Sequence, residues 1–170
     1  MTVKAELRFL REGPRQGEKP GALGTVRFIA RCPGNAHEVL RKTKEVLEVV
    51  LAHDKDDWPP DADWGTLLPE WFVSACAKEQ SQEEAEASLK RWQSLPREEQ
   101  GREEDERCWT VDGWMYWMHP DNRQWYWWDA MVPDTDTVII AVTVPSWPFP
   151  WKDLGWLFRA AGAISLQPEE

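Results

Sequence analysis

Hydrophobic and polar residues alternate in several stretches of the chain, and these stretches predict β-strands. Residues 3–10 alternate in this way and predict a half-buried strand. After a Gly/Pro-rich loop at residues 12–24, the TVRFIA stretch at 25–30 predicts a second strand and therefore an N-terminal hairpin. Towards the C-terminus, short turns separate three further predicted strands, which favours an antiparallel meander at residues 108–118, 124–132 and 137–145.

The middle and the end of the chain have helical spacing instead. Apolar residues recur every three or four positions in 36–53, and Asn35 with Glu38 matches a capping box. Similar patterns predict helices at about 67–78, 82–94 and 150–161. The charged stretch 97–107 fits either a solvated helix extension or a mobile loop.

The order of these elements predicts an α+β fold in a single domain, residues 1–170. We expect an antiparallel sheet, made of the N-terminal hairpin and the C-terminal three-strand meander, with about four helices packed on it. The last strand of the meander, VIIAVTV at 138–144, is apolar on both faces. It should therefore lie inside the sheet and be covered on both sides.

Charge is unevenly distributed and narrows the class of partner. Residues 1–44 hold ten Lys/Arg and four Asp/Glu, whereas residues 45–170 hold ten and twenty-six, which gives the total of −10. An acidic surface repels phosphate backbones and attracts basic proteins, so nucleic acid is not the expected partner. The three cysteines lie far apart and the N-terminus has no signal-peptide pattern, so we expect a cytoplasmic protein. No apolar run reaches 18 residues, so we expect no membrane segment.

Catalytic, cofactor and metal motifs are absent from the sequence. It has no GxSxG, HExxH, Walker or GxGxxG pattern. The acidic loop at 54–65 departs from a calcium loop, because Gly65 falls at position 5 counted from Asp61, where an EF-hand needs Gly at position 6. We therefore predict a binding protein that is not an enzyme and needs no metal or cofactor.

Tryptophan is the unusual residue, with 13 copies against 5 Phe and 2 Tyr. A domain of this size is expected to leave some of these rings accessible, and six of them lie in residues 109–128. A hairpin there would present one candidate binding face formed by Trp114, Tyr116, Trp125 and Trp127. A second candidate face is the acidic loop, with carboxylates for steering and two rings as anchors: Asp54, Asp56, Asp57, Asp61, Asp63, Trp58 and Trp64.

Two segments, WYWWDA at 125–130 and VPSWPFPWKDLGWLFRAAGA at 144–163, resemble the ends of small immunity proteins from bacterial polymorphic toxin systems. The resemblance covers about a third of the chain and carries over no site residue. It implies a cytoplasmic antitoxin that blocks a cognate toxin domain, often a nuclease, and whose partner is therefore a basic toxin domain. The basic N-terminal residues depart from a uniformly acidic inhibitor, which leaves the choice of interface open.

Two other functions remain compatible with the same residues. An aromatic-lined pocket would suit a small-ligand-binding protein or an enzyme, and would have to hold His119 or several carboxylates in contact. A homodimer or larger homo-oligomer would use the tryptophans as its interface.

Overall fold

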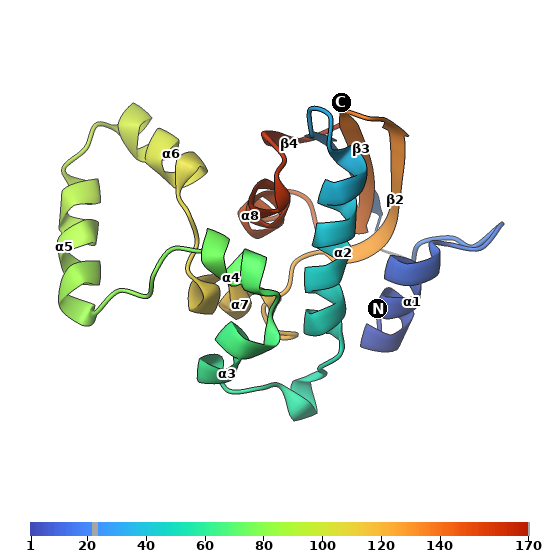
Figure 1. The fold of residues 1–170 in the computed structure, drawn as a ribbon, viewed down its shortest axis with the longest axis horizontal. Helices are drawn as coiled ribbons and strands as arrows, with labels where there is room; N and C mark the ends of the chain where they lie inside the picture. The colour runs from blue at the N-terminus through green and yellow to red at the C-terminus, as the bar shows by residue number, and fades with distance from the viewer. Residues whose placement is uncertain (22–23, 170) are drawn as a thin grey trace.

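The structure is a computed structural model that describes residues 1–21 and 24–169 (Figure 1). Residues 22 and 23 of the expected loop at 12–24 lie outside the described part. Within the described residues the chain is α+β, with one four-stranded antiparallel sheet and eight α-helices. In chain order the elements are α1 (Val3–Glu12), β1 (Thr25–Arg31), α2 (Ala36–Leu51), the 3₁₀-helix η1 (Lys55–Asp57), α3 (Asp61–Leu67), α4 (Glu70–Ala75), α5 (Gln82–Gln93), α6 (Arg97–Glu106), α7 (Val111–Met118), β2 (Tyr126–Asp134), β3 (Thr137–Thr143), α8 (Lys152–Ala161) and β4 (Ser165–Pro168).

The sheet has the order β2-β3-β1-β4, so β3 lies inside it as its apolar sequence predicts. On one face Phe28 of β1 pairs with Ile140 of β3, and both side chains are buried against the helices. On the other face the paired Ile29 and Ile139 are only half-buried. The expectation that both faces of β3 are covered is therefore wrong, because the helices pack on one side of the sheet.

Helix α2 is the element around which the core is built, and it lies where the sequence predicts it. It packs against α1, α8 and β3. Asn35 is its N-cap residue but makes no side-chain hydrogen bond to the helix, so the predicted capping box does not form. The buried side of α2 carries Ala36, Val39, Thr43, Val46, Leu47, Val50 and Leu51.

The predicted N-terminal hairpin is wrong, because the segment 3–10 belongs to helix α1. The Thr2 hydroxyl accepts a hydrogen bond from the Ala5 N–H at 3.2 Å and begins the helix. Most residues of α1 favour a helix, and Leu10 breaks the apolar/polar alternation that suggested a strand. A helical turn brings Glu6, Phe9 and Leu10 to the buried side.

The segment 108–118 is also a helix and not a strand. Thr110 begins α7, because its hydroxyl accepts a hydrogen bond from the Gly113 N–H at 3.0 Å. The buried residues of α7 are Val111, Trp114, Met115 and Met118, which is the spacing of a helix. The three-strand meander is therefore reduced to β2 and β3, and the sheet gains β4, for which the sequence has no clear strand pattern.

The described residues form eight α-helices, where the sequence predicts about four. The helix expected at 67–78 is shortened to α4, whereas α5 closely matches its predicted range. The segment 54–65 is not entirely the expected acidic loop, because it contains η1 and the first residues of α3. The charged stretch 97–107 forms helix α6. Helices α5 and α6 contain no buried residue and project from the body of the protein, and we call them the arm (Figure 1). No helix in the described part of the chain combines the length and apolar character needed to span a bilayer.

Candidate functional site

The aromatic face expected at residues 114–127 does not exist as a surface. The rings of Trp114, Trp125 and Trp127 have no exposed area and belong to the core. Tyr116 lies on the other side of α7 with 60% of its surface exposed, apart from the three indoles. These three tryptophans therefore cannot anchor a partner in this structure, since a partner could not reach them.

The acidic segment 54–65 keeps its five carboxylates in solvent, but one of its two expected anchor rings, Trp64, is buried. Trp64 is fully buried, and Trp58 is half-buried between the rings of Trp64 and His119, with centroid distances of 4.8 and 5.1 Å. Asp54 begins η1 and accepts a hydrogen bond from the Lys55 N–H at 2.7 Å. The five exposed carboxylates of this loop are those of Asp54, Asp56, Asp57, Asp61 and Asp63.

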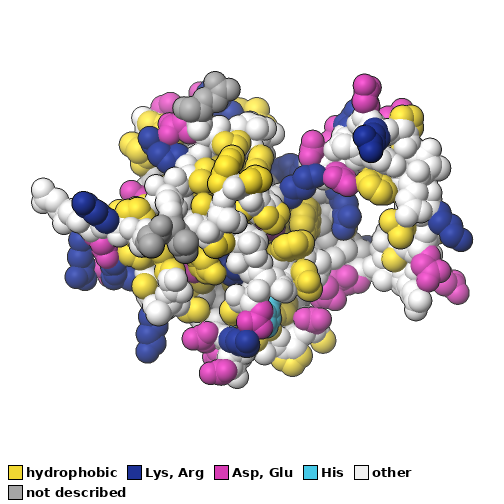
Figure 2. All heavy atoms as spheres, turned by 180° about the vertical axis from the view of Figure 1, so that it is seen from behind, with side chains coloured by type: hydrophobic (Ala, Val, Ile, Leu, Met, Phe, Trp, Pro, Cys, Tyr) yellow, Lys and Arg dark blue, Asp and Glu magenta, His cyan; other side chains and the backbone are white. Residues whose placement is uncertain are grey.

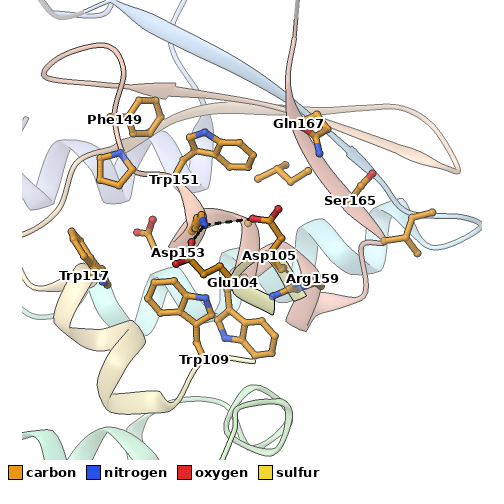
Figure 3. Close-up of a pocket in the computed structure, with 16 residues that line it drawn as sticks. Glu104, Asp105, Trp109, Trp117, Phe149, Trp151, Asp153, Arg159, Ser165 and Gln167 are labelled. Carbon is orange, nitrogen blue, oxygen red and sulfur yellow. Dashed lines mark hydrogen bonds and ion pairs between the residues drawn. The ribbon is translucent and has the colours of Figure 1, made fainter. Parts of the chain in front are cut away.

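Five aromatic side chains, three of them half-buried and two buried, meet elsewhere, in a groove beside α8 with a cavity volume of about 630 Å³ (Figure 3). They come from the segments before α7 and α8 and from the two helices, and they define the aromatic groove: Trp109, Trp117, Phe149, Trp151 and Trp156. Strand β4 contributes a further wall, and Trp109, Trp117 and Trp151 are each half-buried. This volume is within the range of small-ligand pockets.

Asp153 is the buried acid of the aromatic groove. Its carboxylate oxygen Oδ2 accepts a hydrogen bond from Trp125 Nε1 at 2.8 Å, and its backbone oxygen accepts one from Trp114 Nε1 at 3.0 Å. Burial raises the pKa of Asp153 to about 6, and the Trp125 hydrogen bond lowers it in part. The buried indoles of the expected aromatic face therefore position a residue of the groove.

Ion pairs between α8 and α6 form the solvent-exposed rim of the aromatic groove. Lys152 Nζ lies 2.9 Å from a Glu104 oxygen and 3.5 Å from an Asp105 oxygen, as the dashed lines in Figure 3 mark. Arg159 donates hydrogen bonds to the backbone oxygens of Asp105 and Arg107. These contacts hold the base of the arm against α8, but exposed ion pairs of this kind stabilise a structure only weakly.

The sequence contains partial signals for this groove. Trp109 and Trp117 are in the tryptophan-rich segment, but the alternating pattern predicts a strand there and favours other rings as the binding face. Trp151 and Phe149 are in the SWPFPW stretch at 146–151 that leads into α8. Nothing in the local pattern indicates that the two segments, more than thirty residues apart, converge. Long-range contacts bring them together, among them the hydrogen bond from Trp114 of α7 to the backbone oxygen of Asp153 in α8.

Metal binding and similarity to known proteins add no further assignment. In residues 1–21 and 24–169, no group of three or more His, Cys, Asp or Glu side chains could hold a metal ion. His37 is exposed on α2, whereas His53 and His119 lie against Trp64 and Trp58. Comparison with known proteins gives no match: no family model, no curated protein and no solved structure is significantly similar to this chain.

Proposed function

We propose that this protein is a non-catalytic inhibitor of the immunity type, which acts in the bacterial cytoplasm and neutralises a cognate toxin, such as a nuclease, by covering its active surface. The observation that carries the proposal is the aromatic groove, where Trp109, Trp117 and Trp151 remain accessible beside the carboxylates of α6. Half-buried indoles held by a rigid scaffold are typical anchors of protein interfaces.

Charge supports a basic partner. The chain has a net charge of −10, and the acidic loop after α2 exposes five carboxylates. Such a surface increases the association rate with a positively charged protein, and salt weakens this effect. A nuclease domain needs a basic surface to hold its substrate, so it matches this charge.

The test is to co-express the chain with the toxin-domain genes that neighbour its own gene and to measure growth. Neutralisation by the wild-type chain should be lost in Trp109→Ala and Trp151→Ala, because both remove rings of the aromatic groove. Trp71→Ala is the matched control, since Trp71 is also half-buried but lies on α4 outside the groove. Equal loss in all three variants, or no neutralisation of any neighbouring toxin, would contradict the proposal.

A second candidate function is a small-ligand-binding protein or an enzyme that uses the same groove. It is favoured by Asp153, a buried carboxyl group with a pKa near 6 on the wall of a cavity of about 630 Å³. Thermal shift measurements with a panel of aromatic and cationic metabolites test it. A ligand that stabilises the wild type but not Trp151→Ala would favour this function, and no stabilisation by any compound would count against it.

A further inference from the structure

The arm has an apolar stripe that the rest of the protein covers only in part, at Trp92. On α5, Ala85, Leu89 and Trp92 follow one another at the spacing of one helix face. Leu89 has 53% of its surface exposed, and no residue of α5 is buried. The stripe lines a cleft of about 770 Å³, whose other walls are the carboxylate-bearing end of α6 and the residues that join the arm to the body, 77–80 and 107–110. Figure 2 shows the arm standing away from the body, with hydrophobic side chains along its inner edge.

We propose that a second copy of this chain occupies this cleft, and that the α5 helices of the two copies pair antiparallel about a two-fold axis near Ser88. The charges of α5 are self-complementary in this arrangement. On one flank of the stripe, Glu86 of one copy lies opposite Lys90 of the other. On the other flank, Glu84 lies within one residue of the position opposite Arg91, whose guanidinium also pairs with Glu103 of its own copy at 2.8 Å. Opposite charges across such a pair of helices set partner and orientation, as in coiled coils.

The sizes of the apolar side chains fit the same axis. A two-fold axis at residue 88 places the small Ala85 of one copy opposite the Arg91–Trp92 turn of the other, where Trp92 is half-buried. Leu89 lies beside the axis and packs against Leu89 of the second copy. Ser88 lies on the axis, and its small side chain allows the two helices to approach closely. One α5 helix offers three apolar residues, so the interface is smaller than that of an obligate dimer.

Crosslinking locates the axis. In a Cys108→Ser background, which removes the exposed native thiol, Ser88→Cys should form a disulfide-linked dimer under mild oxidation by oxidised glutathione. Each crosslink joins two thiols and passes two electrons and two protons to glutathione disulfide, whose S–S bond breaks to give two molecules of reduced glutathione. Ala87→Cys is the matched control, because Ala87 lies on the same helix but faces away from the stripe. Equal crosslinking of both variants, or none of Ser88→Cys, would overturn this interface.

Light scattering across a micromolar concentration series tests the charge pattern. The wild type should shift from monomer to dimer, and Glu86→Lys should weaken dimerisation by about tenfold, since it places like charges together at two symmetric positions. The double variant Glu86→Lys/Lys90→Glu should restore the dimer. A protein that stays monomeric at every concentration contradicts the dimer. Toxin neutralisation tests the aromatic groove instead, so the dimer and the proposed function can be refuted independently. A monomer in which Leu89→Asp abolishes neutralisation would assign the cleft to the toxin instead.

Discussion

Glu6 and Arg123 form an ion pair inside the protein, and its removal gives the sharpest test of the fold. The two side chains are 1% and 4% exposed, and they are joined by two hydrogen bonds of 2.6 and 2.8 Å. Glu6 also accepts a hydrogen bond from the Trp127 N–H at 2.8 Å. This carboxylate therefore joins α1 to the segment that enters β2.

Glu6→Gln removes the charge and keeps an oxygen for the Trp127 N–H. It leaves the Arg123 guanidinium buried without its counter-ion, a change that costs about 3–5 kcal/mol in proteins. The rings of Trp125 and Tyr126 lie 5.1 and 5.2 Å from this guanidinium and stabilise the cation in part. We therefore expect a loss of about 3 kcal/mol in the free energy of unfolding, or a fall of roughly 10 °C in Tm for a domain of this size.

Urea denaturation followed by circular dichroism measures this loss. Glu48→Gln is the control, because it removes the carboxylate of the exposed Arg11–Glu48 pair, and it should change stability by less than about 0.5 kcal/mol. The double variant Glu6→Gln/Arg123→Met removes the unpaired charge and should recover much of the loss. If Glu6→Gln costs no more than Glu48→Gln, the buried ion pair is not what holds α1 in place.

Three further predictions concern the groove, the arm and α7. The folded-state pKa of Asp153 (about 6) lies above its unfolded value of 3.8, so the stability that its protonation contributes is lost as pH rises from about 4 to about 6. The free energy of unfolding of Asp153→Asn, measured from denaturation curves, should therefore equal that of the wild type at pH 4 and exceed it by up to about 3 kcal/mol at pH 7. A difference that does not change with pH would refute the raised pKa of Asp153. The double variant Lys152→Ala/Arg159→Ala should speed amide hydrogen exchange and tryptic cleavage in α6 without changing Tm. Unchanged exchange would mean that the contacts of Lys152 and Arg159 do not hold the arm against α8. Gly113→Ala should cost about 1 kcal/mol, because its new Cβ would lie 2.9 Å from the Thr110 hydroxyl that begins α7, whereas Gly101→Ala on α6 meets nothing within 4 Å and should stabilise slightly.

Several elements follow from the sequence alone, since their patterns fit only one kind of structure. Helix α2 has sixteen residues with apolar side chains at helical spacing, and no strand could bury that set on one face. Strand β3 is a run of β-branched residues that is apolar on both faces, which places it inside the sheet. The net charge and the exposure of the five carboxylates between residues 54 and 63 also follow from the sequence, because charged side chains stay in solvent whether the segment is a loop or a helix.

The tertiary structure determined whether the short segments form strands or helices, and which aromatic rings remain accessible. Residues 3–10 and 108–118 have patterns that partly fit both a strand and a helix, and long-range partners select the helix. For α1 that partner is Arg123, 117 residues away from Glu6. Which tryptophans line the aromatic groove depends in the same way on contacts between distant segments. The sequence specifies that indoles are abundant, but packing selects those that a partner can reach.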